Sequence, residues 1–374
     1  MRVIVIGGGI VGAGAAYHLT RCGVSTTLVD RADRGQATAA GAGVIFPWPF
    51  PGMAAEVRDF RLKAAAHYPA LMAELADDGQ DPTGYEVVGG ISVSTDDAAA
   101  DGDREALLRL AAQPGYEGIG EVTRLERGGP ARRFPVLRED YSGVMVAGMA
   151  RLNGRQARAA LLHAAEERAL RRRRGDAELI GDGTRVIGVR VGAEELRADA
   201  VVVAAGAWSA ELLRPFGVEL PVHPVRGQIL HLAMPGRGTA DWPIVRVGDR
   251  GHYMVTFAPN RVVVGATREP EAGFDHRVTG GGLHHVLSEA LETAPGLAEA
   301  TVVETRVGFR PAGRDGLQLL GGIESLPGVV VATGLGAEGL TYGPYQGMVA
   351  AELAMGNASE TDLTPFRPDR AAAV

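Results

Sequence analysis

The chain has 374 residues, of which 46% are hydrophobic and 22% are charged, an ordinary composition for a globular protein with an ample core. Its formal net charge of −7 argues against nucleic acid as a partner, because binding phosphates requires a basic face. Cys22 is the only cysteine, so no internal disulfide and no cysteine-based metal site can form, and we expect no metal. The apolar stretch over residues 3–16 is too short and too rich in glycine for a membrane span. With no leader before the first strand, we expect a cytoplasmic protein without an integral membrane segment.

The first thirty residues follow the order of a dinucleotide-binding βαβ unit. A β-branched run over residues 2–6 leads into three glycines, a helical pattern follows, and a second strand over residues 26–29 ends on Asp30. A structural glycine loop is the alternative interpretation of the glycines alone. The full order of strand, glycines, helix, strand and acid favours a nucleotide site.

Each residue of this unit has a physical purpose in nucleotide binding. Gly7 permits the tight turn, Gly9 lets the backbone approach a pyrophosphate, and Gly12 lets helix and strand pack closely. The N–H groups at the start of the helix can donate to phosphates. Asp30 stands where a carboxylate can accept hydrogen bonds from a ribose diol.

The middle of the chain changes from helical to strand character. The spacing predicts a helix from an N-cap at Asn153 to about Arg173, with the arginine run 171–174 as a solvated C-terminus. Two strands are expected over 186–191 and 199–205, and the second runs into Gly206, at the kind of strand end where open α/β sheets bind ligands. From 221 to about 267 the alternation indicates antiparallel strands.

A similar order of elements recurs near the C-terminus, where the sequence predicts a strand over 328–333, a glycine-rich turn over 334–339 and a helix over 340–355. Both ends of the chain are therefore expected to build one sheet. We predict an α/β fold in which a Rossmann-like domain is interleaved with a second domain that is mostly an antiparallel sheet. The first domain is expected to comprise residues 1–85, 145–215 and 306–374, and the second residues 86–144 and 216–305.

Taken together, these segments resemble the D-amino-acid oxidase family of FAD-dependent amine oxidoreductases, in particular its glycine oxidase and sarcosine oxidase branch. The resemblance spans nearly the whole length and implies a glutathione-reductase-type FAD-binding domain beside a substrate domain. It rests on the N-terminal unit, Thr38–Val44, Val201–Ser209, Arg226-Gly227-Gln228, Gly308-Phe309-Arg310-Pro311, Asp315-Gly316 and Gly334–Pro344. A nicotinamide dehydrogenase would need only the first of these.

The resemblance implies that the cofactor is FAD, held without a covalent bond. It puts Ile10 and Val11 at the pyrophosphate, and Asp30 and Arg31 at the adenosine ribose. The loop residues implied at the pyrophosphate and flavin are Ala37, Thr38, Ala42, Gly43 and Val44. The remaining implied cofactor residues are Gly206, Gly334, Leu335, Gly336, Ala337, Glu338, Gly339, Leu340 and Thr341, and the helix after this turn would point at the flavin N1 and C2=O. A helix N-terminus there would stabilise the anion of reduced flavin. The residue that contacts adenine cannot be placed.

For the substrate, the resemblance implies that Arg310 holds a carboxylate, which suits the planar fork of a guanidinium. The alternative is a structural pair between Arg310 and Asp315. Tyr253 is implied as a hydroxyl donor to the same carboxylate, or else it is a sheet aromatic, and Trp48 either caps the pocket or only packs.

The chain departs from the glycine oxidase branch at one point. Where that branch has a second arginine in the C-terminal turn, this chain has Ala337 followed by Glu338. An acid near the flavin would disfavour a second carboxylate on the substrate and favour an extra amine, unless Glu338 faces solvent.

The implied activity is FAD-dependent oxidation of a small amine that carries a carboxylate, such as a D-amino acid or an N-alkyl glycine. Hydride would pass from Cα to flavin N5, the imine would hydrolyse, and O2 would reoxidise the cofactor. Two alternatives stay open: a dehydrogenase of the same fold that passes electrons to a quinone or partner protein, and a non-catalytic FAD-binding subunit. A homo-oligomer is compatible with either activity.

Overall fold

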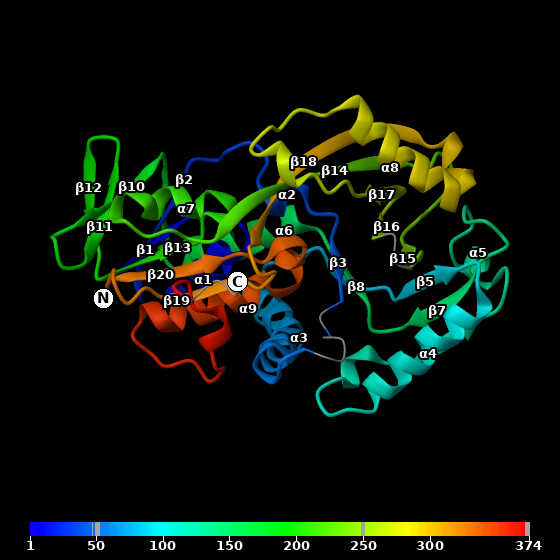
Figure 1. Cartoon of the computed structure of the whole chain (residues 1–374), viewed down its shortest axis with the longest axis horizontal. Coiled ribbons are helices and arrows are strands. Elements are labelled where there is room, and N and C mark those ends of the chain that lie inside the picture. The colour runs from blue at the N-terminus through cyan, green and yellow to red at the C-terminus, as the bar shows by residue number, and fades with distance from the viewer. Residues whose placement is uncertain (47, 49–52, 248–250, 371–374) are drawn as a thin grey trace.

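The computed structural model describes residues 1–46, 48, 53–247 and 251–370. Its first lobe is built on a six-stranded sheet with the strand order β19-β20-β13-β1-β2-β9 (Figure 1). The five strands from β20 to β9 are parallel, and β19 runs antiparallel to β20 at one edge. The bounds are β1 Arg2–Ile6, β2 Ser25–Asp30, β9 Arg171–Arg174, β13 Ala200–Val203, β19 Leu319–Gly322 and β20 Val329–Thr333.

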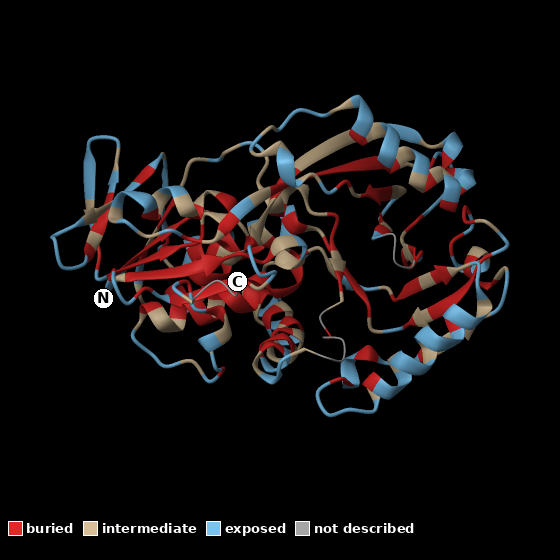
Figure 2. Cartoon of the chain, viewed as in Figure 1, coloured by how far each residue is buried: buried red, intermediate tan, exposed pale blue. Residues whose placement is uncertain are grey.

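The two faces of this sheet pack against different layers, because alternate residues of a strand point to opposite faces. Val3 and Val5 of β1 pack with helices, whereas Ile4 and Ile6 pack with a small antiparallel sheet. The helical layer contains α1 Ile10–Arg21, α3 Ala55–Asp77, α6 Gly154–Glu167 and α9 Gly339–Ala354. The small sheet contains β10 Ala177–Gly181, β11 Val186–Val191 and β12 Glu194–Arg197, and α7 Ser209–Leu213 packs beside it. In Figure 2 the central strands are buried and the tips of the small sheet are exposed.

The second lobe is an eight-stranded sheet with the order β18-β14-β17-β16-β15-β5-β7-β6. Its neighbours pair antiparallel, except for β5 and β15, which pair parallel. The bounds are β5 Gly90–Ser94, β6 Val122–Leu125, β7 Ser142–Val146, β14 Val222–Ala233, β15 Ile244–Val247, β16 His252–Phe257, β17 Arg261–Gly265 and β18 Thr301–Gly313. Helix α8 Gly280–Thr293 covers β14 and β17, and α4 Asp97–Ala111 lies against β6 and β7, with α5 Gly129–Arg133 beside them (Figure 1).

Short elements connect the two lobes. A three-stranded sheet joins β3 Val44–Ile45, β8 Ala150–Leu152 and β4 Tyr85–Val87, and α2 Ala37–Ala40 lies against β18 and α6. The long strands β14 and β18 reach from the second sheet toward the first (Figure 1). The loop after β2, which contains α2, and the turn before α9 thereby both lie against β18.

The predicted α/β class and the Rossmann-like domain beside an antiparallel sheet are confirmed. The helix predicted to reach Arg173 is wrong, because α6 ends at Glu167 and Arg171–Arg174 form the edge strand β9. All four arginines are exposed on that edge, so the run carries no apolar alternation that could identify a strand.

Two predicted domain boundaries also need correction. The boundaries at 145 and 306 fall inside β7 and β18, and both strands belong wholly to the eight-stranded sheet. We retain the rest of the division into a cofactor domain and a substrate domain as a proposal. In the described ranges no helix is both long and apolar enough to cross a membrane.

Candidate active site

A cavity of about 720 Å³ runs between the two sheets. Its lining comes from the ends of β1, β13 and β20 on one side and from β14, β15, β16 and β18 on the other. Every predicted cofactor and substrate residue lines it except Gly12 and Gly334. These two glycines instead pack closely against backbone just outside the lining. A Cβ at Gly12 would stand 1.9 Å from the Gly7 carbonyl oxygen, and a Cβ at Gly334 would stand 2.9 Å from the Leu319 nitrogen.

The glycine loop after β1 is held by close backbone packing. Gly7 has a φ of +101°, and a Cβ there would lie 2.4 Å from the Ala204 carbonyl oxygen. The loop leads into α1, whose N-cap Gly9 has no side chain to bond the first turn. The Ile10 N–H instead donates to Thr38 Oγ1 at 2.9 Å. The loop and α2 therefore fix each other's position.

The Asp30 carboxylate makes hydrogen bonds to the backbone that the sequence did not predict. One carboxylate oxygen accepts the Gly8 N–H at 2.6 Å, and the other accepts the Ala32 N–H at 2.5 Å. Asp30 therefore holds the glycine loop in shape at the place where a ribose diol was expected. Arg31 pairs with Asp33 at 2.8 Å and with Asp176 at 3.2 Å.

The segment 175–179 lines the cavity beside these residues. It follows the edge strand β9 and begins the small sheet, with Gly175 and Asp176 in the turn. The sequence could not place any contact to adenine here, because the segment 177–185 is shorter than the family resemblance leads one to expect. The correct strand assignment would have brought this turn beside Asp30.

The C-terminal turn and the loop 36–44 meet at the middle of the cavity. The Thr341 hydroxyl donates to the Val44 carbonyl at 3.4 Å, and a Cβ at Gly41 would meet the Leu340 side chain at 2.7 Å. Helix α9 begins at Gly339 without a side-chain cap. At Gly206, Gly336 and Gly339, all in the lining, a Cβ would meet no protein atom within 4 Å. The lining at this point is therefore open backbone and a helix N-terminus.

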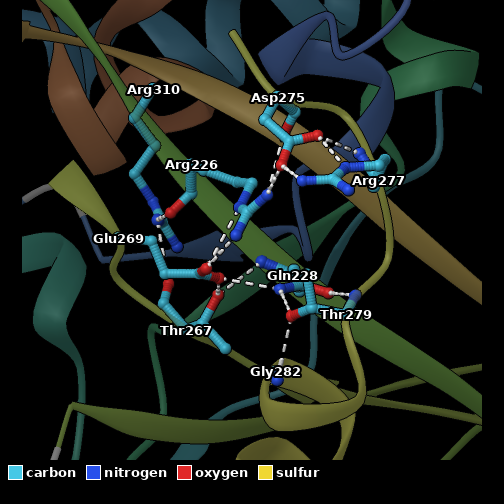
Figure 3. Close-up of polar contacts among 9 residues, drawn as sticks. All are labelled: Arg226, Gln228, Thr267, Glu269, Asp275, Arg277, Thr279, Gly282 and Arg310. Atoms are coloured by element: carbon cyan, nitrogen blue, oxygen red, sulfur yellow. Dashed lines mark hydrogen bonds and ion pairs between the residues drawn. The ribbon is translucent and has the colours of Figure 1, made fainter. Parts of the chain in front are cut away.

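Arg310 projects from β18 across Gly227 of β14, where a Cβ would stand 2.4 Å from its guanidinium. Its Nη1 donates to the carbonyl oxygens of Thr267 at 3.0 Å and Arg226 at 3.4 Å (Figure 3). The guanidinium also lies beside the Tyr253 hydroxyl. Burial lowers the pKa of Arg310 and raises the pKa of Tyr253, while each of the two opposes the shift of the other. The alternative pair with Asp315 is wrong, because Asp315 bonds Arg370 at 2.8 Å instead.

A polar network outside the cavity supports Arg310. Arg226 is only 6% exposed, and it bonds Glu269 at 3.0 Å and Asp275 at 2.9 Å (Figure 3). Glu269 also accepts from the Thr267 hydroxyl at 2.6 Å and from Gln228 at 2.8 Å. Burial alone would raise the pKa of Glu269, but these bonds, first that from Arg226, hold it below its ordinary value. The network thus fixes the two residues whose carbonyls orient Arg310.

Glu338 and Trp48 both line the cavity. Glu338 is paired with Arg61 of α3 at 2.8 Å, although 45% of its side chain is exposed. Burial raises the pKa of Glu338, and the Arg61 charge opposes the rise. The Arg61 guanidinium also lies 5.0 Å from the centre of the Tyr342 ring. Trp48 is buried and packs edge-on against Phe46 at 5.4 Å, so it contributes to the wall by packing.

The comparisons with known proteins identify the family. A family model described as FAD dependent oxidoreductase matches residues 2–353. The chain belongs to this family. It is similar to an uncharacterized oxidoreductase of Bacillus subtilis, with 41% identity over 98% of both chains, and to a glycine oxidase of Pseudomonas aeruginosa, with 30% identity over 98% of both. Among solved structures it is similar to an iminodiacetate oxidase from Chelativorans sp. BNC1, with 39% identity, a TM-score of 0.93, and coverage of 98% of this chain and 99% of that one.

The predicted FAD-dependent oxidoreductase, with FAD as its cofactor, is therefore confirmed. The residues present fit FAD, because the glycine loop, the carboxylate of Asp30 and the uncapped start of α9 line one continuous cavity. The open backbone at Gly206, Gly336 and Gly339 leaves room for a flat ring system. The sequence missed two arginines of the lining, Arg61 and Arg246, because neither lies in a glycine-rich motif.

Proposed function

We propose that this FAD-dependent oxidoreductase oxidises a small amine that carries a carboxylate, of the D-amino acid or N-alkyl glycine type, with O2 as the electron acceptor. The observation that carries the proposal is Arg310, a guanidinium in the cavity that bonds two backbone carbonyls, lies beside Tyr253 and has no carboxylate partner among the described residues. A desolvated guanidinium favours an anion, and a substrate carboxylate matches its planar fork.

The cofactor residues of the proposal are those of the sequence analysis. Gly7, Gly9, Ile10 and Val11 would receive the pyrophosphate, while Asp30 and Arg31 would lie at the ribose. The loop 37–44, the turn 334–341 and Gly206 would line the flavin site, and the first turn of α9 would face the pyrimidine edge of the flavin. When bound, FAD supplies the acceptor for the hydride from the substrate Cα and returns the electrons to O2 as hydrogen peroxide.

The protein's own part is to bind and orient. Arg310 would hold the carboxylate from one side, and the Tyr253 hydroxyl, already in contact with Arg310, would add a donor. Fixing the carboxylate at two points limits the directions in which the Cα–H bond can point, which is the main requirement for hydride transfer. The imine product then takes up water and separates into a carbonyl compound and an amine.

The relatives support this class of substrate. The iminodiacetate oxidase and the glycine oxidase are both named for small amines with carboxylates, and both match this chain from end to end. Neither name establishes the substrate of this protein, because the C-terminal turn has Ala337 and Glu338 where the glycine oxidase branch has an arginine.

The test is a visible spectrum of the purified holoprotein without oxygen, before and after addition of pooled D-amino acids and N-alkyl glycines. We expect the bands of oxidised flavin to bleach, and peroxide to form in step with substrate loss once air is admitted. Bleaching with electron transfer to a dye but without peroxide would replace the oxidase by a dehydrogenase. A flavin that no member of the pool reduces would contradict the proposed substrate class.

A further inference from the structure

Arg246 is a cavity arginine that the proposed function does not use. It lies on β15 directly opposite Tyr253 of β16 in an antiparallel pair, so both side chains leave the same face of the sheet. Both residues line the cavity. Since Tyr253 in turn lies beside Arg310, the three residues follow one another across the substrate end of the cavity.

The Arg246 guanidinium has no hydrogen-bond or ion-pair partner in the described part of the chain. Burial lowers its pKa, and only the more distant charge of Asp103 on α4 opposes this. A half-buried guanidinium without a partner has lost water without gaining bonds, which is costly unless a ligand supplies them. Its fork suits a carboxylate.

Two other arginines near the site are already engaged, and Arg268, whose charge acts on Arg310, does not line the cavity. Arg61 is occupied by Glu338 and by the ring of Tyr342. Arg226 is occupied by Glu269 and Asp275. Because Arg61 pairs with Glu338, that acid no longer repels a second carboxylate as the sequence suggested. Within the described cavity lining on the eight-stranded sheet, Arg246 and Arg310 are the two guanidiniums without a carboxylate partner.

We propose that Arg246 binds a second carboxylate, so that the substrate is an amino dicarboxylate whose two acid groups are held by Arg310 and Arg246. This rests on the proposed function, which assigns the first carboxylate to Arg310. Arg310 on β18 and Arg246 on β15 are four strands apart in the sheet, about 19 Å at about 4.8 Å per strand. Both side chains are long and both line the cavity, so we expect the gap between the two guanidiniums to suit a small dicarboxylate. A secondary amine with an acetate arm on each side has this form. One arm would be fixed for oxidation and the other would anchor the molecule.

The first test measures binding without turnover. Diglycolate, the ether that carries two acetate arms, and methoxyacetate, which carries one, contain no oxidisable amine. Calorimetry with holoprotein at constant ionic strength should give diglycolate an affinity at least about 30-fold higher, since a charge-assisted pair is added. Arg246→Gln should remove this preference and leave methoxyacetate unchanged. Arg261→Gln on β17 of the same sheet, outside the cavity lining, is the matched control.

The second test compares turnover of iminodiacetate with that of sarcosine. Arg246→Gln should raise the KM for iminodiacetate by about 30-fold or more and change that for sarcosine little. Arg246→Lys keeps the charge but not the planar fork, so its KM for iminodiacetate should lie between those of the wild type and of Arg246→Gln. This variant replaces Arg246→Gln in the test if the glutamine variant does not fold.

The outcomes separate the two proposals. Equal binding of diglycolate and methoxyacetate, or a preference that survives in both variants, overturns the role of Arg246 even if amines are oxidised. A preference that depends on Arg246, in a protein that oxidises neither amine, supports the second carboxylate site and contradicts the proposed reaction.

Discussion

At the end of the cavity formed by the six-stranded sheet, the lining includes backbone at strand and helix ends, with Gly7, Gly9 and Gly206, beside side chains such as Asp30. At the end formed by the eight-stranded sheet, the lining is side chains, among them Arg246, Tyr253 and Arg310. The first end consists of short motifs, each continuous in sequence. The second end is assembled from strands that lie far apart in the sequence, from Gly227 on β14 to Arg310 on β18.

This difference predicts how each end responds to substitution. A backbone surface has no side chain to lose, so change there means adding atoms where none fit, and folding or cofactor binding fails. A side-chain surface can lose its functional groups while the strands remain paired, so substrate binding fails and the flavin stays. The following variants are chosen to break or sharpen that distinction.

Gly12→Ala should have the largest effect. The added Cβ would lie 1.9 Å from the Gly7 carbonyl oxygen, which is backbone and cannot yield without moving the glycine loop. We expect the free energy of unfolding to fall by about 3 kcal/mol or more, and most of the bound FAD to be lost. Urea unfolding and the ratio of flavin to protein absorbance measure the two effects.

The matched control is Gly102→Ala, in the middle of α4, where a Cβ would meet nothing within 4 Å. There the same change should stabilise the protein by about 0.5–1 kcal/mol, because alanine favours a helix. A Gly12→Ala protein that keeps its flavin and its stability would show that the loop is not a rigid backbone surface.

Arg310→Gln should have the opposite profile. The flavin content should stay at its wild-type value, while kcat/KM for the carboxylate-bearing amine falls by about 100-fold or more, since a buried charge-assisted pair is lost. Steady-state kinetics and absorbance on one preparation test both points. Arg314→Gln, exposed at the end of the same strand region, should change neither. Normal turnover by Arg310→Gln would refute its role in carboxylate binding.

The sequence predicted the backbone end well because local sterics determine it. The order of strand, glycines and helix around Gly7 and Gly12 has few other interpretations, and the loop 37–44 and the turn 335–341 both contribute to the cavity lining, while their contacts with the cofactor stay a prediction. Asp30 is the exception in detail. Its carboxylate faces Gly8 and Ala32, and such a contact between two loops depends on the turn geometry that only the structure shows.

The side-chain end could be predicted only where a residue adjoins a motif. Arg310 stands in Gly308-Phe309-Arg310-Pro311, and the resemblance singled it out as a cavity residue, whereas Arg246 stands in an ordinary strand and was not singled out. Its place in the cavity lining depends on the register that sets it opposite Tyr253, and the strand pattern in the sequence does not reveal which face of β15 lines the cavity. Arg61 was missed for a similar reason: its partner Glu338 is 277 residues away.

Glu269→Gln tests whether the network behind Arg310 positions it. The substitution removes a charge from the buried Arg226 guanidinium, although Asp275 remains, so we expect a loss of about 2–3 kcal/mol in stability. The carbonyls of Thr267 and Arg226 that orient Arg310 should also move, and KM should rise about tenfold with a smaller change in kcat. Glu271→Gln, two residues on and exposed, is the control. A destabilised variant with an unchanged KM would separate the network from the substrate site.

The smallest expected effect concerns acid stability and belongs to the helical layer behind the backbone end. Burial lowers the pKa of His67 to about 4, and burial, with the nearby His67 and Arg21 charges, lowers that of His18 to about 3. The two rings lie 5.5 Å apart between α1 and α3. Unfolding frees each histidine to take up a proton near its ordinary pKa of 6.5. The unfolded state therefore binds more protons, and stability is lost as the pH falls below about 6.5.

Each histidine should account for about 2 kcal/mol of the stability lost between pH 7 and pH 5. His67→Leu removes one titrating group, so its free energy of unfolding should fall less over that range than that of the wild type. Urea unfolding at pH 7, 6 and 5 measures the difference, and His285→Gln on the exposed face of α8 should behave as the wild type does. The same pH slope in His67→Leu as in the wild type would mean that acid sensitivity arises elsewhere, and the strand-built lobe, where burial also lowers the pKa of His231 to about 4, would be the next place to measure.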